Sequence, residues 1–227
     1  VVTRLQDASV TLTFEYIPGV EQNIRFTDPT SINYKELMGA SAIIISRHLF
    51  SPEVHRWVEI ARQLGIPHYY YLDDNFIVLS KEIPELSDYT EANMRAELAS
   101  FHGVLVSSPK LVNFFSEHNI HSKIHLFPPT MPAQNWLDHL EIPEKAKDVT
   151  RIGFMGGAHR QNDFTKFVLP AIARLAKDHA VELVIGGNHR ISIDDYPSLK
   201  IYQFPYDTSY RLALGRMQSA NIDILIH

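Results

Sequence analysis

Short apolar segments rich in Val, Ile and Tyr alternate along this chain with longer amphipathic segments of helical periodicity. This alternation is typical of a parallel β-sheet whose strands are joined by crossover helices. We therefore predict an α/β fold with parallel sheets flanked by helices. The expected strands are residues 11–17, 41–46, 66–72, 103–108 and 124–127 in the first half, then 152–155, 181–187, 199–204 and 222–227.

Capping signals predict the ends of three helices. Ser51, with Pro52 at the first helical position, starts one helix, and Gly65 ends it. Thr90 and Ser108 are suited to the N-cap positions of the next two. The other expected helices cover residues 164–180 and 209–220.

Residues 131–149 separate the two runs of alternation. They are rich in Pro and charged residues and contain no clear strand, which is typical of a domain connection. We predict an N-terminal domain over residues 1–130, a linker over 131–149 and a C-terminal domain over 150–227. No glycine-rich first turn opens the chain, and no helix follows its last expected strand. We therefore expect a truncated protein whose second domain is incomplete and whose first domain can lack its start.

The composition excludes several classes of protein. A net charge of -5 over 227 residues leaves no excess of Lys and Arg to neutralise a nucleic-acid backbone. The chain has no Cys, which excludes disulfides and thiolate metal sites. Its apolar runs are far shorter than the roughly 20 residues of a membrane helix. We expect a cytoplasmic protein, with peripheral contact at the inner face of the cell membrane as an alternative.

Three histidines have the spacing of a zinc site. His118, His121 and His125 are three and four residues apart, as ligands on one helix face would be. However, the helix that follows Ser108 is expected to end near Asn119, so His125 falls on the next strand. The three rings would then diverge, and we predict no metal.

A pair of glycines follows the first strand of the second half. This strand, residues 152–155, leads into Gly156 and Gly157, then His159 and Arg160. Glycines let the backbone turn with positive φ and approach a ligand closely, and free N–H groups at the next helix favour an anion. The G-x-G-x-x-G spacing is absent, so NAD is not predicted. The turn fits a phosphate, with a tight turn that binds no ligand as the alternative.

A resemblance to a known family extends over nearly the whole chain. The order and spacing of four later motifs resemble the opening of the donor domain of GT-B glycosyltransferases: RIGFMGG, VIGG, YQFPYDTSY and IDILIH. The earlier motifs GIPHYYYLDDNF, GVLVSSPKLVNFF and IHLFPP resemble the later part of the acceptor domain and its passage into the linker. The resemblance implies two facing Rossmann-like domains, a nucleotide-diphosphate sugar bound mainly by the second, and metal-independent transfer to an acceptor held by the first.

The resemblance also implies which residues bind the donor. The glycine turn would lie against the diphosphate, and basic groups there would neutralise the leaving diphosphate. The turn after the second strand of this domain would lie beside the nucleotide, and an aromatic segment would pass its base, although buried core positions are an alternative for the aromatics. The predicted donor-binding residues are Gly156, Gly157, His159, Arg160, Gly186, Gly187, Tyr202 and Phe204.

Two adjacent aspartates follow the expected strand of residues 66–72. Asp73 and Asp74 lie at its carboxyl end, where α/β folds place their chemistry. We predict them as catalytic residues, either as a general base for an acceptor hydroxyl or as a stabiliser of positive charge on the sugar. Capping of the next turn is the alternative. Arg47, His48 and Asn75 are predicted to contact substrate, and Arg47 could also pair with either aspartate.

The function that the resemblance implies is transfer of a sugar from a nucleotide-diphosphate donor to a saccharide, a lipid-linked saccharide or another hydroxyl acceptor. The setting would be bacterial surface polysaccharide synthesis, with no cofactor beyond the donor and no nucleic-acid partner. Since a fold does not determine a reaction, three alternatives stay open: a nucleotide-sugar epimerase, a sugar phosphorylase, and a non-catalytic nucleotide-sugar-binding fragment. A homo-oligomer also stays open, because a second copy could cover the last strand.

Overall fold

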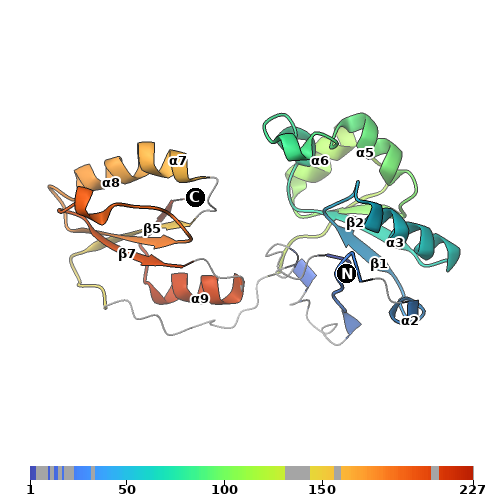
Figure 1. Ribbon diagram of the computed structural model, residues 1–227, viewed down its shortest axis with the longest axis horizontal. Helices are drawn as coiled ribbons and strands as arrows, with labels where there is room; N and C mark the ends of the chain where they lie inside the picture. The colour runs from blue at the N-terminus through green and yellow to red at the C-terminus, as the bar shows by residue number, and fades with distance from the viewer. Residues whose placement is uncertain are drawn as a thin grey trace. The chain divides into compact units, whose positions relative to one another are not determined.

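The computed structural model describes residues 1–3, 10, 13–14, 17, 23–31, 34–130, 144–155, 160–205 and 210–226. The chain divides into two compact units, unit 1 (Val1–Pro132) and unit 2 (Ala133–His227). Each unit contains a parallel four-stranded sheet with helices packed against it (Figure 1), so the α/β prediction is confirmed. The first 13 residues of the predicted linker, 131–143, lie outside the described residues, and no helix or strand forms over 144–149.

The sheet of unit 1 has the strand order β1-β2-β3-β4. Its strands are β1 (Ile43–Ser46), β2 (His68–Leu72), β3 (Gly103–Val106) and β4 (Ile124–Leu126). Beyond β1, Val2 forms parallel bridges with both Ile45 and Thr27. The chain therefore moves outwards from Val2 to Thr27 and then returns to β1 on the other side of Val2. Such a reversal is a topological switch point, and open α/β sheets bind ligands outside the carboxyl ends of the strands there.

The helices of unit 1 begin at the capping residues that the sequence indicates. The Ser51 hydroxyl accepts a hydrogen bond from the N–H of Val54 at 3.2 Å, and Gly65 follows the helix with a φ of 65°. Thr90 and Ser108 cap their helices in the same way. The single-turn helices show no periodicity and were not predicted. The helices are α2 (Tyr34–Leu37), α3 (Pro52–Gln63), α4 (Phe76–Leu79), η2 (Pro84–Leu86), α5 (Glu91–Leu98) and α6 (Pro109–Glu117).

The strand predicted over residues 11–17 is wrong where the structure can test it. Most of that segment lies outside the described residues, but Thr13 and Phe14 are helical, as is Val10. All three are buried, and their i, i+3, i+4 spacing is that of one helix face. Oγ1 of Thr13 lies 2.7 Å from the hydroxyl of Tyr71, and the ring of Phe14 packs edge-on against the Tyr71 ring at 5.0 Å. Thr13 and Phe14 therefore pack against β2 of the sheet from helical positions.

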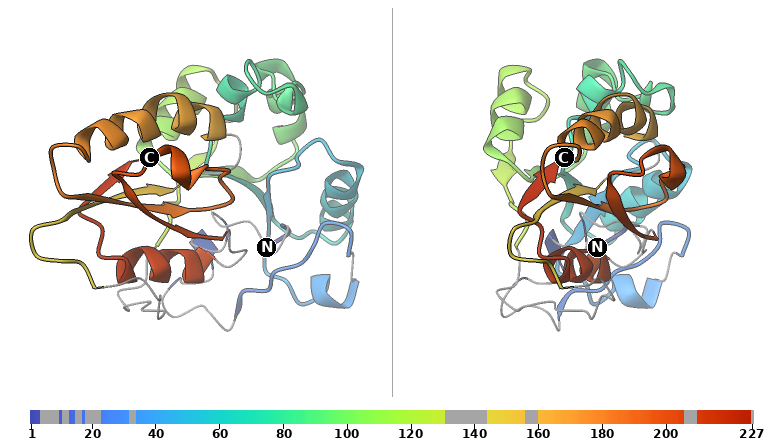
Figure 2. Two further views of the ribbon diagram at one scale, coloured as in Figure 1. Left: turned by 60° about the vertical axis from the view of Figure 1, so that its left-hand side comes forward. Right: turned by 90° about the vertical axis from the view of Figure 1, so that its left-hand side faces the viewer.

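The sheet of unit 2 has the strand order β7-β6-β5-β8, so its first strand lies between the second and the fourth. In two views of the unit, α7 and α8 cover one face of this sheet and α9 covers the other (Figures 1 and 2). The strands are β5 (Thr150–Met155), β6 (Val181–Gly186), β7 (Lys200–Phe204) and β8 (Ile224–Ile226). The helices are α7 (Gln161–Asp163), η4 (Phe164–Val168), α8 (Leu169–Leu175), η5 (Ile193–Asp195) and α9 (Tyr210–Ser219).

The helix predicted over residues 164–180 starts earlier and ends earlier than expected. It begins at Gln161 with α7 and ends at Leu175 with α8. Between them, η4 is a π-helix in which the N–H of Leu169 bonds to the carbonyl of Phe164. Pro170 follows at once, and proline lacks an N–H and crowds the carbonyl four residues before it, so the widened turn absorbs it.

Candidate functional site

The carboxyl ends of β1, β2 and β3 meet at one edge of the unit 1 sheet, because their residues pair in register. Arg47 and His48 follow β1 directly, and Asp73 and Asp74 follow β2 directly. This edge adjoins the switch point between Val2 and β1, where a ligand is expected. The structure thus brings four of the predicted site residues to one edge.

Arg47 and Asp73 form a salt bridge at this edge. Nη2 of Arg47 lies 2.8 Å from Oδ2 of Asp73 and 3.8 Å from Oδ2 of Asp74. The Asp73 side chain is only 13% exposed, whereas that of Asp74 is 54% exposed. The pairing of Arg47 that the sequence left open is therefore present, and it leaves Asp74 as the carboxylate that faces solvent.

Asp74 has an altered affinity for protons. Partial burial raises the pKa of the Asp74 carboxyl above its usual value, the negative charge of Asp73 raises it further, and Arg47 opposes both effects. A carboxylate with a raised pKa takes up a proton more readily at neutral pH, which suits it to general base catalysis.

The backbone leaves β1 in a strained conformation. Arg47 and His48 have φ values of 58° and 48°, in the left-handed region that residues other than Gly rarely adopt. Each such residue costs on the order of 1–3 kcal/mol, and strain of this kind gathers at functional sites. The guanidinium of Arg47 also lies over the ring of Phe76, 5.8 Å from its centroid. No Gly or Asn signals this turn, so the sequence could not predict it.

Sequence reasoning missed several buried polar groups close to the salt bridge. Tyr70 is fully buried, and this burial together with the neighbouring Tyr89 raises the pKa of Tyr70 well above its usual value. The Tyr89 hydroxyl accepts a hydrogen bond from the N–H of Leu49 at 3.3 Å. Among the described residues, Oδ1 of Asp73 and Oγ of Ser46 are buried without a hydrogen-bond partner. Such atoms usually indicate an ordered water or a ligand group.

Asn75 acts as a helix cap, and its predicted contact with substrate stays a prediction. Its Oδ1 accepts a hydrogen bond from the N–H of Val78 at 3.2 Å at the start of α4. The capping role considered for Asp73 or Asp74 therefore falls on Asn75. The hydroxyl of Ser107, at the end of β3, donates to the carbonyl of Asp73 at 3.1 Å and so fixes the backbone that carries the two aspartates.

The carboxyl end of β5, which precedes the predicted glycine turn, lies at the switch point of the unit 2 sheet. This point lies between β5 and β8, where the strand order reverses. Gly156, Gly157 and His159 follow β5 but lie outside the described residues. Arg160 is described, is half-buried and directly precedes α7.

A glutamine joins the start of α7 to the loop after β6, which we call the β6 loop (residues 187–190). Nε2 of Gln161 donates to the carbonyl of Arg190 at 3.0 Å, and Oε1 of Gln161 accepts from the N–H of Arg190, also at 3.0 Å. Both backbone groups of Arg190 are therefore bound by one side chain. Arg160 precedes this glutamine, so the contact links the two segments that carry the arginines.

A second glutamine fixes the other end of the β6 loop. Nε2 of Gln203, on β7, donates to the carbonyls of Gly187 at 3.1 Å and of His189 at 2.7 Å. The ring of His189 is buried against Phe154 and Phe164, with centroids 5.3 Å and 5.4 Å away. Sequence reasoning missed both glutamines, because their partners are distant in sequence.

The remaining donor-site predictions fall on packed positions. A Cβ on Gly186 would lie 2.8 Å from Cε2 of Phe204, so glycine is needed there for close packing against that buried ring. Gly187 has a φ of 121°, which favours glycine. Tyr202 lies in the middle of β7, with its ring 5.5 Å from the guanidinium of Arg151. Phe204 is buried, as expected of the alternative that it is a core residue.

No protein-family model matches the chain, and neither does any curated protein. Among solved structures, Alr3699/HepE of Anabaena, in complex with UDP and glucose, aligns over 92% of this chain with a TM-score of 0.52 and 10% identity. The chain spans 62% of that protein, which is less than two thirds. The fold is of the GT-B type. UGT89C1 of Arabidopsis thaliana, complexed with UDP-L-rhamnose, aligns over 72% of this chain and 40% of its own length, with a TM-score of 0.39 and 16% identity.

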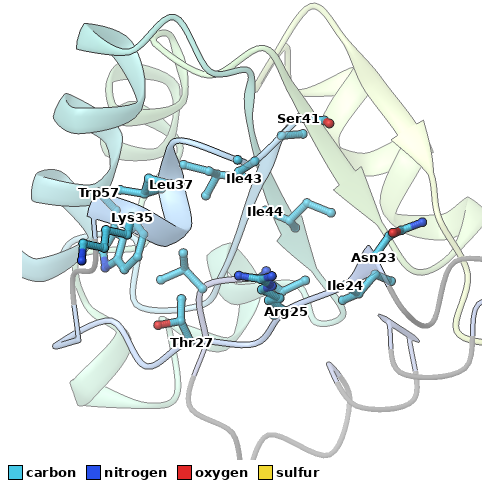
Figure 3. Close-up of a pocket in the computed structure, with 15 residues that line it drawn as sticks. Asn23, Ile24, Arg25, Thr27, Lys35, Leu37, Ser41, Ile43, Ile44 and Trp57 are labelled. Atoms are coloured by element: carbon cyan, nitrogen blue, oxygen red, sulfur yellow. The ribbon is translucent and has the colours of Figure 1, made fainter.

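A cavity in unit 1 lies away from the predicted site residues that the structure describes. Figure 3 shows a cavity of about 830 Å³ in unit 1, lined by residues such as Arg25, Lys35 and Trp57. It lies where the chain enters β1 at Ile43, which is the amino end of the strand. None of the predicted site residues that the structure describes lines it.

Two of the three histidines with zinc-like spacing have separate partners. Nδ1 of His118 lies 2.8 Å from Oε1 of Glu91, and Nδ1 of His121 accepts from the N–H of Lys123 at 3.0 Å. Over the described ranges, no group of three His, Cys, Asp or Glu residues could hold a metal ion. Within the same ranges, every helix is too short or too polar to cross a membrane.

Proposed function

We propose that the chain forms part of a glycosyltransferase that transfers a sugar from a nucleotide-diphosphate donor to a hydroxyl acceptor. The observation that carries this proposal is the pair of unequal carboxylates at the ligand-binding edge of a GT-B fold. Asp73 is bound to Arg47, while Asp74 is exposed and has a raised pKa. This arrangement supplies one carboxylate for structure and one for chemistry.

In the proposed reaction, Asp74 is the general base. It accepts the proton of the acceptor hydroxyl while that oxygen attacks the anomeric carbon, and the bond from this carbon to the diphosphate oxygen breaks. The salt bridge with Arg47 fixes Asp73, and Asp73 in turn fixes the backbone position of the adjacent Asp74. Stabilisation of positive charge on the sugar ring is the other role that the exposure of Asp74 allows.

Unit 2 is proposed to bind the donor. Gly156, Gly157 and His159 remain predicted diphosphate contacts, together with Arg160, which directly precedes α7. A guanidinium can bind phosphate oxygens with two parallel hydrogen bonds, and so neutralise the leaving diphosphate. We propose on this ground that transfer needs no metal ion and no cofactor beyond the donor.

The acceptor is proposed to be a saccharide or a lipid-linked saccharide in bacterial surface polysaccharide synthesis. The support is the Asp73-Asp74 pair after a buried strand, a feature by which the chain resembles glycosyltransferases of that pathway. A place in the cytoplasm, at the inner face of the membrane, would fit such an acceptor.

Release of nucleoside diphosphate from UDP-, GDP- or dTDP-glucose, in the presence of a saccharide acceptor, tests the proposal. The wild-type chain should release one of the three diphosphates, and Asp74→Asn should slow release by about a hundredfold or more. Arg56→Ala, an exposed position on α3, is the control and should have no effect. Equal rates for wild type and Asp74→Asn would remove Asp74 from the catalytic role.

A further inference from the structure

The β6 loop of unit 2 combines a fixed backbone with an exposed cation. The backbone N–H and carbonyl of Arg190 are both bound by Gln161 at 3.0 Å. Gln203 binds the carbonyl of His189 at 2.7 Å, one residue before Arg190. The side chain of Arg190 is exposed, and no carboxylate among the described residues lies within salt-bridge distance of it.

Holding the β6 loop in one conformation costs conformational entropy, and packing alone does not explain why the chain bears this cost. Two side-chain amides lose their conformational freedom to hold a loop at the surface, where loops usually move. A binding group gains most from such an arrangement, because a residue on a fixed backbone pays less entropy when a ligand binds. The contacts of Gln161 and Gln203 with the β6 loop therefore indicate that the position of Arg190 matters for binding.

The contact of Gln161 with Arg190 also links a second arginine to the segment that carries Arg160. Arg160 is adjacent to Gln161 in the chain, and Gln161 touches Arg190, so both arginines lie at the carboxyl edge formed by β5 and β6. Each guanidinium can bind one phosphate group with two hydrogen bonds, and two such groups match a ligand with two phosphates.

We infer that Arg190 is a second diphosphate-binding residue and that Gln161 is the residue that positions it. The inference rests on the proposed function, since the ligand is the diphosphate of a nucleotide sugar. Together the two arginines supply two positive charges to the leaving diphosphate. Gln161 has no contact with the ligand in this account and acts only through the backbone of Arg190.

Calorimetric titration with UDP and UMP, and with the GDP/GMP and dTDP/dTMP pairs, tests the inference. Wild type should bind one diphosphate more tightly than its monophosphate, and Arg190→Ala should lower that preference about tenfold, the expected loss for one charged hydrogen-bonding partner. The preference of Arg190→Lys for the diphosphate should lie between those of wild type and Arg190→Ala, because lysine keeps the positive charge but cannot form the two parallel hydrogen bonds of a guanidinium. Arg174→Ala, which removes an exposed arginine from α8, is the matched control and should bind like wild type.

A double-mutant cycle separates positioning from simple stabilisation. Gln161→Ala should weaken binding of the diphosphate in the wild-type background but not in the Arg190→Ala background, whereas any loss in melting temperature should appear in both. If the preferred diphosphate binds wild type and Arg190→Ala equally, the assignment of Arg190 is overturned and the proposed function stands. If wild type binds none of the three diphosphates, both are overturned.

Discussion

Nη2 of Arg47 lies 2.8 Å from Oδ2 of Asp73, and this contact joins the ends of two neighbouring parallel strands. The carboxylate is only 13% exposed, so it depends on the guanidinium for compensation. Loss of Arg47 would leave a largely buried charge without its partner, which is more costly than loss of both charges. The pair therefore has a stabilising role that is separable from the chemistry of Asp74.

Arg47→Ala should lower the free energy of unfolding by about 1–3 kcal/mol, because Asp73 remains buried without its cation. In the Asp73→Asn background, the same change should cost less. Chemical denaturation of the four chains of this cycle measures the coupling, with Arg56→Ala as an exposed arginine control on the same unit. Additive effects would mean that the salt bridge does not couple the two strands.

Asp74→Asn should raise the melting temperature at neutral pH. The pKa of Asp74 is raised in the folded chain, so the folded state binds this proton more tightly than the unfolded state. Ionised Asp74 therefore destabilises the fold above its raised pKa, and this penalty disappears as the pH falls through that pKa. Thermal melts of wild type and variant from pH 7 to pH 3 should converge at the acid end. A variant that is less stable than wild type at pH 7 would contradict the raised pKa.

Glu182→Ala should destabilise unit 2 by about 3 kcal/mol, the usual cost of breaking a buried ion pair. Nη2 and Nε of the buried Arg151 donate to Oε2 of Glu182 at 2.6 Å and 3.0 Å, and Lys200 donates to Oε1 at 2.9 Å. Burial alone would raise the pKa of Glu182, but the hydrogen bonds from Lys200 and Arg151 outweigh it and lower this pKa.

The pH dependence of unit 2 provides a check on the same pair. Because the folded-state pKa of Glu182 is lowered, its contribution to stability is present above its usual pKa and is lost as the pH falls through the lowered value. The difference in free energy of unfolding between wild type and Glu182→Ala should therefore be larger at pH 7 than under strongly acid conditions. Lys200→Ala removes an exposed partner and should have a much smaller effect at either pH. If the difference in stability between wild type and Glu182→Ala is the same at every pH, the variant has lost packing and not a charge interaction.

Gly186→Ala should destabilise unit 2 by about 1–3 kcal/mol through overpacking. Its new methyl group would lie 2.8 Å from the ring of Phe204, and Phe204→Leu should relieve part of the cost. If Gly186 serves packing only, the double variant should bind nucleotide like wild type. Lost binding in a stably folded double variant would instead indicate that Gly186 or Phe204 contacts the ligand, and Phe204→Leu alone separates the two. Gly39→Ala is the control, since the space around that position is open.

The elements that local chemistry specifies could be predicted from the sequence. Ser51, Thr90 and Ser108 cap the helices expected of them, and the short β-branched runs form the strands. The helical conformation of Thr13 and Phe14 was not predicted, because Thr alternates with apolar residues there, as it does in many strands. Single-turn helices are too short to show a periodicity, and they were not predicted for that reason.

The candidate site was predictable in position but not in its detailed contacts. A strand end in an α/β fold indicates an edge where ligands bind, and that reasoning found Arg47, Asp73 and Asp74. It could not divide the roles of the two aspartates, because their exposures depend on how β1 and β2 pack. The contact of Gln161 with Arg190 joins residues 29 positions apart, and no local pattern signals it.

Calorimetric titration of the chain with UDP-, GDP- and dTDP-glucose measures whether it binds a nucleotide-sugar donor. We expect that one of the three binds, and that Arg160→Ala weakens this binding about tenfold or more while Arg174→Ala does not, since of these two arginines only Arg160 lies at the predicted diphosphate turn. Binding that is equal in all three chains would remove Arg160 from the donor site. Absence of binding by every one of the three nucleotide sugars would contradict the proposal that the chain is part of a glycosyltransferase.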